Sequence, residues 1–264
     1  MTSWVRFKHD ERIHFGALQQ DDRIVIHKGD LFDKPEPTGA TVSLDEVTLL
    51  PPLEPRSIIG LWNNYHQLAA KLGSAITAHP LYFFKSIGAV IGPEAKIEAA
   101  ASVGRVAYEG ELAIIVGRRI RDATQEEAAS AIFGYTCIND VSALDVLSAD
   151  PSFPQWARAK SCDGFAPLGP VIVTDLDVGQ ARLRTLVNGR ERQNYPLSDM
   201  IFDPPTIVRL LSKDMSLYPG DVIACGTSIG SLPMRPDTTV EICIDGIGIL
   251  RNQYVQTKNG AGEE

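Results

Sequence analysis

The segment VAYEGELAIIVG, residues 106–117, predicts a β-strand whose second half is entirely apolar and is therefore buried on both faces. Two glutamates, Glu109 and Glu111, stand at its leading edge. Alternate residues of a strand point to the same side, about 6.5–7 Å apart, so we expect both carboxylates to converge beside the side-chain-free Gly110. Two ionised carboxylates next to a buried strand are costly unless a cation or a proton compensates them. A pair on the solvated face of an edge strand is the alternative interpretation.

A third carboxylate follows the next predicted elements. Residues 124–127, Thr-Gln-Glu-Glu, have the arrangement of a capping box, which predicts a helix that runs to about Phe133. The strand-like residues 134–138 then end in Asn139 and Asp140. This spacing is typical of a strand, helix, strand excursion that returns beside the first strand, so we expect Asp140 to join the two glutamates. Three oxygen ligands without His or Cys favour Mg²⁺ or Mn²⁺ over zinc.

The composition is that of a globular chain. Of its 264 residues 44% are hydrophobic, which excludes disorder as the main state, and 25 basic against 33 acidic residues give a net charge of −8. A surface of that sign repels phosphate backbones, so no nucleic-acid partner is predicted. The four cysteines stand far apart without a CxxC pair, which disfavours a disulfide framework and a zinc ribbon.

Membrane and export signals are missing from the sequence pattern. No apolar run approaches the roughly 20 residues that a membrane-spanning helix needs. The first ten residues mix charged and apolar side chains and show no secretory signal. We therefore expect a cytoplasmic protein without a membrane partner.

The strand signals divide the chain into two parts. Short strand-like runs from residue 4 to about residue 26, separated by polar turns, predict a small β-meander. Three prolines within residues 51–55 prevent a regular element and predict an extended connector. The fold class is mostly β with a few helices (α+β). We place a small N-terminal β domain at residues 1–52, the main domain at residues 53–255 and a frayed tail at residues 256–264.

Local signals predict further elements of the main domain. Asn188-Gly189 suits a type I′ hairpin turn, and the alternating apolar residues before Asp245-Gly246 predict a second hairpin. Pro204-Pro205 predicts the start of a helix. Residues 63–72 form another helix-like stretch, which we interpret as a lid that closes over the site.

Two further clusters contain candidate site residues. Lys160 would be a fixed cation near the carboxylates, where it would hold an enolate or carboxylate oxygen as charge develops; a solvated lysine is the alternative. Gly226-Thr227-Ser228 opens a Gly-rich turn after a buried strand, and the N–H groups and hydroxyls of such a turn bind anions. The turn lacks the lysine of a phosphate loop, so nucleotide binding is not predicted.

Taken in order, these segments resemble the fumarylacetoacetate hydrolase family. The resemblance covers about residues 55–252, and the order and spacing of many short motifs carry it. The matching segments are residues 84–86, 91–93, 108–113, 134–142, 159–161, 167–170, 187–189, 219–221, 226–227 and 245–248. The leading meander is similar to the small N-terminal domain of many bacterial members.

The resemblance implies a mixed β-roll as the catalytic fold, usually in a homodimer. It also implies that Mg²⁺ or Mn²⁺ is held by the carboxylates that match Glu109, Glu111 and Asp140, in agreement with the interpretation of the residues themselves. In this family the metal chelates a 2-oxo acid and polarises its carbonyl, so that a neighbouring C–C bond breaks with an enolate as leaving group.

The same match assigns roles to residues around the metal. It implies that Lys160 stabilises the enolate and that Thr227 binds a substrate carboxylate. Tyr108 and Gly226 are placed by it in the substrate-binding set.

The chain departs from the family pattern where water would be activated. In the family, the segment that matches residues 60–71 has a His and a Glu that act together, but His66 is shifted from that spacing and Lys71 stands where the Glu is expected. His66 is still the candidate general base, since a neutral imidazole suits that role near pH 7; a core or surface histidine is the alternative. Leu144 and Leu147 replace an Arg and a Gln of many members, so two polar substrate contacts are lost.

The expected function is cleavage of a C–C bond in a 2,4-dioxo (acylpyruvate-type) acid, in which water attacks the distal carbonyl and pyruvate leaves as an enolate. The alternative is decarboxylation or isomerisation of a 2-oxo or 2-hydroxydienoic diacid, including oxaloacetate-type decarboxylation, which needs no activated water. Residues 160–165 resemble decarboxylase/isomerase members of aromatic-compound catabolism. A remote alternative is a non-enzymatic Ca²⁺-binding module.

Overall fold

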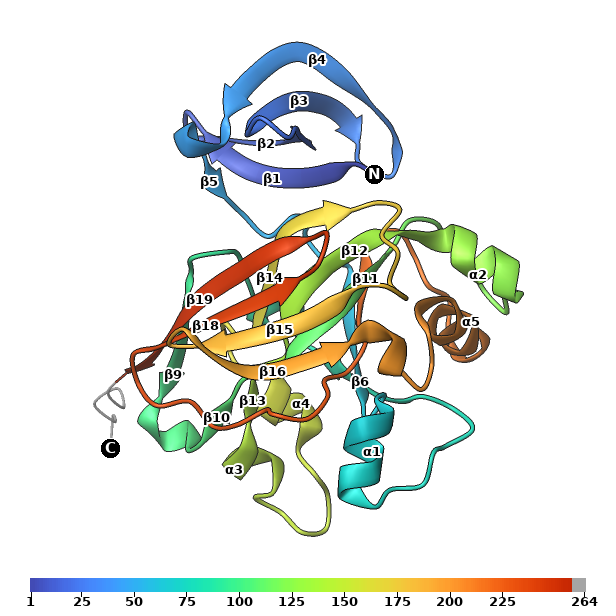
Figure 1. Ribbon diagram of the computed structural model, residues 1–264, viewed down its shortest axis with the longest axis vertical. Helices are drawn as coiled ribbons and strands as arrows, with labels where there is room; N and C mark the ends of the chain where they lie inside the picture. Colours follow the sequence, from blue (N-terminus) through green and yellow to red (C-terminus); the bar gives the residue numbers. More distant parts are fainter. Residues whose placement is uncertain (258–264) are drawn as a thin grey trace.

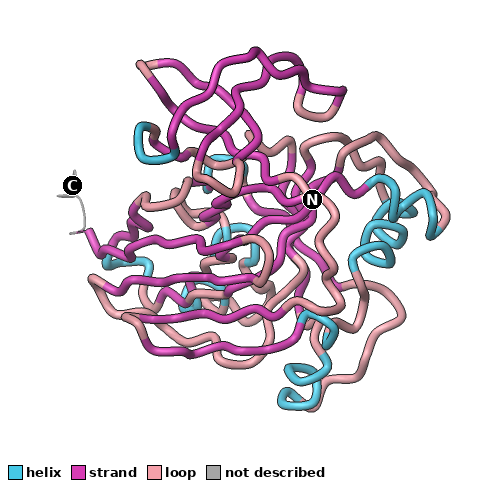
Figure 2. Tube along the Cα trace, turned by 45° about the horizontal axis from the view of Figure 1, so that its top comes forward, coloured by secondary structure: helices cyan, strands magenta, loops and turns pink. Residues whose placement is uncertain are grey.

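Strands are the predominant regular element of the structure, a computed structural model that describes residues 1–257. Figure 1 shows the order of the elements, and Figure 2 shows how strands predominate over helices. The prediction of a mostly β chain with a few helices is confirmed. No helix within the described residues is long and apolar enough to cross a membrane.

The larger sheet runs through the whole molecule. Its strands, in spatial order, are β4 (Asp33–Ser43), β3 (Arg23–Asp30), β2 (Arg12–Leu18), β1 (Ser3–His9), β14 (Ala166–Val173), β12 (Ile132–Asn139), β11 (Gly110–Val116), β17 (Asp221–Ala224), β6 (Ser57–Trp62) and β7 (Leu81–Lys85). Two short strands join it from the side: β5 (Thr48–Leu49) pairs with β1, and β8 (Val90–Ile91) pairs with β14. Every residue of the central strand β11 is buried, as its apolar run predicts.

A second sheet packs against the first. It consists of β16 (Arg190–Pro196), β15 (Arg182–Val187), β18 (Thr238–Ile244), β19 (Gly248–Thr257) and β9 (Lys96–Ala100). Both predicted hairpins are present, β15 with β16 and β18 with β19. Asn188 and Gly189 have φ angles of 50° and 72°, as the two central residues of a type I′ turn require.

The helices are short and few. They are α1 (His66–Leu72), α2 (Gln125–Ala131), α3 (Leu144–Leu147), α4 (Trp156–Lys160) and α5 (Pro204–Asp214), with single 3₁₀ turns at Leu44–Glu46, Ile87–Ala89, Ala101–Val103 and Leu197–Asp199. The predicted capping box is present: the Thr124 hydroxyl accepts the Glu127 N–H, and the Glu127 carboxylate accepts the Thr124 N–H. The helix that it begins ends at Ala131, where β12 takes over. Figure 1 shows α2 beside α5.

The N-terminal strands extend the large sheet rather than forming a sheet of their own. β1 pairs antiparallel with β14, with Ser3 opposite Val173 and Trp4 opposite Ile172. The strand β4 was not expected from the sequence, since it contains Pro35 and Pro37 and shows no alternation; such residues are tolerated because β4 is an edge strand. At the other terminus β19 reaches Thr257, and the remainder of the expected tail, 258–264, lies outside the described residues.

The expected single strand over residues 106–116 is interrupted. β10 (Val106–Ala107) pairs with β13 (Ser142–Ala143) in a separate two-stranded sheet, and β11 begins only at Gly110. The chain leaves one sheet and enters another at Tyr108-Glu109, so Glu109 lies in the break. Its position is still determined, because its N–H donates to Asn139 Oδ1 at 3.0 Å and its carbonyl accepts the Asp140 N–H at 2.9 Å.

At Gly110 the large sheet is in close contact with the second sheet. Its N–H donates to Gln193 Oε1 at 3.1 Å, and the buried hydroxyl of Thr185 donates to the same oxygen at 2.8 Å. A Cβ at this position would collide with the Thr185 hydroxyl and lie 3.1 Å from Gln193 Oε1. The second sheet therefore requires a residue without a side chain between the two glutamates.

We predict that Gly110→Ala lowers the free energy of unfolding by about 1–3 kcal/mol, the usual cost of overpacking a filled core. Urea unfolding of the purified variant measures it. Gly88→Ala is the matched control, because Gly88 is exposed and a Cβ there would meet only the Ser86 hydroxyl at 3.4 Å. Equal stability of the two variants would contradict the packing argument.

Candidate active site

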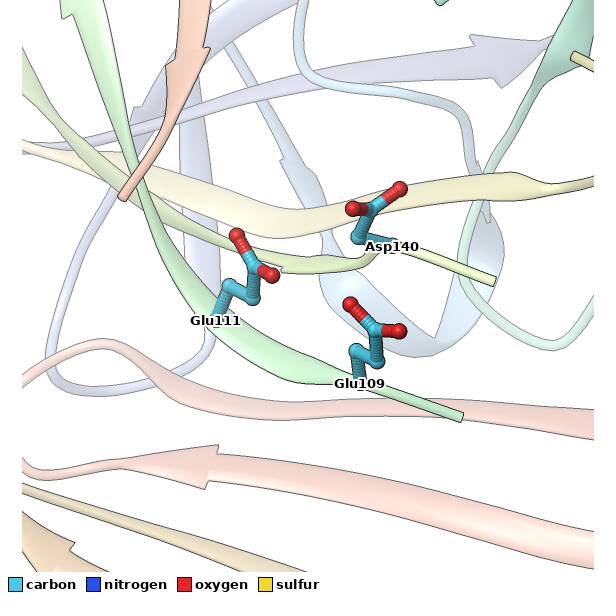
Figure 3. Close-up of side chains that lie close together, drawn as sticks. All are labelled: Glu109, Glu111 and Asp140. Carbon is cyan, nitrogen blue, oxygen red and sulfur yellow. The ribbon is translucent and has the colours of Figure 1, made fainter. Parts of the chain in front are cut away.

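Three carboxylates converge where β11 and β12 meet. Glu111 lies on β11, Glu109 in the break before it, and Asp140 directly after β12. Because Gly110 pairs with Asn139, the strand ends that carry these residues coincide. One oxygen from each carboxylate lies within 4.8 Å of the others, and Figure 3 shows the three side chains close together. The structure thus brings together the three residues that the sequence singled out.

Two buried ammonium groups hold Asp140 from both sides. Lys160 Nζ, at the end of α4, lies 2.6 Å from Asp140 Oδ2 and 2.9 Å from Glu109 Oε2. Lys85 Nζ, at the end of β7, lies 2.5 Å from Asp140 Oδ1. The Ser142 hydroxyl donates to Glu109 Oε1 at 2.8 Å. Lys160 is therefore buried and paired, whereas Lys85 was not identified from the sequence as a site residue.

Burial and these charges decide the protonation states. Burial raises the pKa of Glu111 well above its usual range, and the charges of Asp140 and Glu109 raise it further. Burial alone would raise the pKa of Asp140 too, but the ammonium groups of Lys160 and Lys85 outweigh it and lower that pKa. Burial opposes the charge on Lys160, yet the neighbouring carboxylates raise its pKa above the usual value. Lys160 therefore stays a cation at neutral pH.

Glu111 is the carboxylate without a counter-charge of its own. Its Oε2 accepts the Gly226 N–H at 2.8 Å, while its buried Oε1 has no hydrogen-bond partner within residues 1–257. A buried, unpaired carboxylate oxygen beside two further carboxylates is a position that a hard divalent cation satisfies. The residues present therefore fit the expected Mg²⁺ or Mn²⁺, without distinguishing the two ions.

Gly226 binds Glu111 through its backbone N–H and does not line the cavity. Its φ of 87° lies in the left-handed region, and a Cβ would meet Leu61 O and Asn64 Cβ at 3.2 Å each. Only glycine lets the backbone N–H approach the carboxylate in this conformation.

The two hydroxyls assigned to substrate by resemblance are engaged within the protein. The Thr227 hydroxyl donates to Gly110 O at 2.9 Å and accepts Gln193 Nε2 at 2.8 Å, although Thr227 itself lines the cavity. The Tyr108 hydroxyl donates to Gly230 O at 2.8 Å, and Tyr108 is fully buried. Both residues hold the loop after β17 against the carboxylate strand, and their substrate contacts stay predictions.

A cavity of about 260 Å³ adjoins the carboxylates. Glu109 and Lys160 form its polar end, and Leu144 and Leu147, the two departures from the family pattern, form part of its apolar wall. Its complete lining is Leu61, Trp62, Asn63, Leu68, Lys71, Leu72, Phe83, Glu109, Leu144, Leu147, Trp156, Lys160, Thr227, Ser228, Ile229, Gly230 and Ser231.

His66 lies away from this lining. It is the first residue of α1 and is exposed, while Leu68, Lys71 and Leu72 are the residues of that helix that line the cavity. Each helical residue turns the side-chain direction by about 100°, so His66 points roughly 200° from Leu68. The helix was expected, but its cavity-facing side carries a lysine and leucines.

Two polar groups of the lining lack partners within residues 1–257: Ser228 belongs to the Gly-rich turn that the sequence singled out as an anion site, whereas Asn63 was not identified from the sequence. Ser228 Oγ and Asn63 Oδ1 are buried with no hydrogen-bond partner in the described part of the chain. Asn63 also has a positive φ of 57°. Unpaired buried polar groups are costly, so both are suited to a ligand in the cavity. The Gly-rich turn and the Asn63-Asn64 pair are visible in the sequence, but neither pattern indicates in which direction a side chain points.

Two protein-family models together match most of the chain. The family model described as Fumarylacetoacetate (FAA) hydrolase C-terminal matches residues 57–255, and one described as Rv2993c-like, N-terminal matches residues 3–52. The chain belongs to the fumarylacetoacetate hydrolase family, which is a family of enzymes.

Similar proteins extend over nearly the same length. Protein Rv2993c of Mycobacterium tuberculosis is 42% identical over 228 residues, 85% of each chain. Oxaloacetate tautomerase YisK of Bacillus subtilis is 35% identical over 257 residues, 90% of this chain and 84% of that protein. The crystal structure of 5-carboxymethyl-2-hydroxymuconate delta-isomerase from Mycobacterium smegmatis has a TM-score of 0.90 and 38% identity, covering 97% of this chain and 100% of that one.

We predict that chelator-treated protein binds one Mn²⁺ and that Glu111→Gln weakens this binding. Mutation of a residue that only contacts a metal ligand lowers metal affinity roughly 10–100-fold, so loss of a ligand itself should lower it at least as much. Isothermal titration calorimetry measures it. Glu98→Gln, an exposed change on β9, should bind like the wild type. Preference for Ca²⁺ over Mn²⁺ and Mg²⁺ would instead favour the structural calcium interpretation.

We predict that Lys85→Met lowers the stability of the metal-free protein by about 3–5 kcal/mol, because it leaves Asp140 buried with one partner fewer. Denaturant unfolding reports the change. Lys28→Met is the matched control: its ion pair with Glu36 is exposed and is worth about 1 kcal/mol or less. A loss for Lys85→Met no larger than that of the control would show that the pairing of Asp140 contributes little.

Proposed function

We propose that the protein is a divalent-metal-dependent isomerase or decarboxylase that forms the enolate of a 2-oxo diacid. In the isomerase direction a base takes the C3 proton, for which Glu109 is the carboxylate of the cavity lining. The electron pair of the C3–H bond forms the C2–C3 double bond, the C2 oxygen takes the negative charge, and the proton then returns to that oxygen or to another carbon. In decarboxylation the bond from C3 to a carboxylate breaks instead, CO₂ leaves, and C3 is then protonated. Both reactions share the same enolate.

The composition of the cavity lining carries this proposal. Its titratable residues are Lys71, Glu109 and Lys160, and no histidine is among the described residues that line it. Hydrolysis needs a base that activates water, and His66, the candidate for that role, is exposed outside the lining. Decarboxylation needs the electron sink and a stabilising cation but no base, and isomerisation needs a base for the C3 proton but no activated water. The site therefore supports the alternative better than the hydrolysis of an acylpyruvate.

The residues of the site have different roles in this reaction. A Mg²⁺ or Mn²⁺ ion held by Glu109, Glu111 and Asp140 would supply Lewis acidity toward the carbonyl of a 2-oxo acid. Lys160 places a permanent positive charge where the enolate oxygen develops, since its pKa is raised. Its Nζ also lies 5.0 Å from the centre of the Phe83 ring, which shields that charge from water. The unpaired Ser228 hydroxyl is suited to donate to the substrate carboxylate.

The names of similar proteins support the same class. One relative is an oxaloacetate tautomerase, and a solved structure is described as a delta-isomerase. A further relative, from Salmonella dublin, is a bifunctional isomerase/decarboxylase of 4-hydroxyphenylacetate degradation. We propose by this similarity that the substrate arises in aromatic-compound catabolism or is a small 2-oxo diacid.

The homodimer expected by resemblance is part of the proposal. β7 is the edge strand of the large sheet, and Leu81, Tyr82 and Phe84 expose 41%, 36% and 50% of their surface. An edge that presents large apolar side chains is suited to be covered by a second copy. The expected cytoplasmic location stays a prediction.

Product analysis by NMR tests the reaction. Chelator-treated protein is incubated with and without Mg²⁺ on oxaloacetate and on acetylpyruvate, side by side, in deuterated buffer. We expect Mg²⁺-dependent exchange at C3 of oxaloacetate, or pyruvate formation from it, and no acetate from acetylpyruvate. Metal-dependent release of acetate plus pyruvate would overturn the proposal and establish hydrolysis.

We predict that Lys160→Met lowers the turnover number by about 10²–10³, the scale of losing one oxyanion-stabilising donor, while Mn²⁺ still binds. Steady-state rates and calorimetry together measure the two effects. Arg158→Met, an exposed change on the same helix, is the control and should leave the rate unchanged. Unchanged turnover in Lys160→Met would mean that this lysine is only structural.

A further inference from the structure

One cation of the cavity is not used by the carboxylate centre. Lys71 and Lys160 are the lysines of the lining, and Lys160 is bonded to Glu109 and Asp140. Lys71 forms no hydrogen bond or ion pair with any described residue. Its charge is therefore available to a ligand in the cavity.

Lys71 is flanked by apolar residues of the cavity lining. It lies on α1 between Leu68 and Leu72, and all three residues line the cavity. Leu144 and Leu147 of α3 line it too. Lys71 is exposed, whereas Glu111 and Asp140 are buried, so Lys71 lies on the solvent side of the lining. The cavity thus has a charged inner end, an apolar middle and a single cation at its mouth.

The charges of the cavity indicate how many carboxylates a bound substrate can carry. At the inner end, three ionised carboxylates, two ammonium groups and a bound divalent ion would sum to a net charge of +1. One substrate carboxylate next to the 2-oxo group neutralises it. A second carboxylate on the same substrate would then lie against leucine side chains, where an unpaired charge is costly. Lys71 is the remaining group of the lining that can pair with it.

We propose that Lys71 binds the distal carboxylate of the substrate and makes the enzyme selective for 2-oxo diacids over 2-oxo monoacids. The inference rests on the proposed function, because it places the 2-oxo acid end of the substrate at the carboxylate centre. Lys71 acts in binding and takes no part in the proton transfers.

Binding of matched inert ligands tests this without turnover. 2-Oxoglutarate and 2-oxopentanoate have five carbons each and differ only in a distal carboxylate against a methyl group. Calorimetry with Mg²⁺-loaded protein gives both dissociation constants. Pairs with six and seven carbons, 2-oxohexanoate with 2-oxoadipate and 2-oxoheptanoate with 2-oxopimelate, measure the span from the centre to Lys71.

We expect the wild type to bind the diacid of at least one pair about tenfold more tightly than its monoacid. Lys71→Met should abolish that preference and leave the monoacid dissociation constant unchanged, Lys71→Arg should retain it, and Lys71→Glu should invert it. Lys213→Met, an exposed lysine at the end of α5 and outside the lining, is the control and should bind like the wild type.

Two results would overturn the inference: a wild type with no diacid preference in any pair, or a preference that survives in Lys71→Met. Failure of the proposed function looks different. If diacid binding depends on the metal and on Lys71, but neither exchange at C3 nor CO₂ release occurs, the binding role of Lys71 holds and the proposed reaction is refuted. If turnover occurs and Lys71→Met keeps the preference for diacids, the reaction holds and the binding role is refuted.

Discussion

The carboxylate of Asp140 is buried with an ammonium group on each of its oxygens, and the arrangement of the site depends on that pairing. Asp140 follows β12, Lys85 ends β7, and Lys160 ends α4, so three distant segments meet at one side chain. Each of these charges would be costly if it were buried alone. The segments must therefore assemble together, and in doing so they bring Lys160 and Glu109 to the inner end of the cavity.

The centre of the site was accessible from the sequence because it obeys short-range rules. The alternation expected of a strand predicted Glu109 beside Glu111, and the length of the excursion after Val116 predicted the return of the chain to Asp140. The same local chemistry predicted the hairpin at Asn188-Gly189 and the helix after Thr124. Even the unexpected break in the strand left the carboxylates together, since backbone hydrogen bonds anchor Glu109 to residues 139–140.

What the sequence did not reveal depends on long-range contacts. Lys85 is a single lysine in an aromatic strand, and its role exists only because the parallel pairing of β6 with β17 and the antiparallel pairing of β7 with β6 bring its end to Asp140. The direction of His66 likewise depends on where α1 begins. The hydroxyl of Thr227 was a reasonable anion ligand until the second sheet was seen to engage it through Gln193.

The pairing of β1 with β14 has a consequence for how the chain is made. The strands β1 to β5 are synthesised before β14. β5 covers the edge of β1 at Phe7 and Lys8, but Ser3 and Trp4 find their partners only when Ile172 and Val173 exist. An unpaired edge strand is a template for association with other chains. On the ribosome, β1 therefore emerges well before β14, and the growing chain carries an uncovered strand edge at Ser3 and Trp4 until β14 follows.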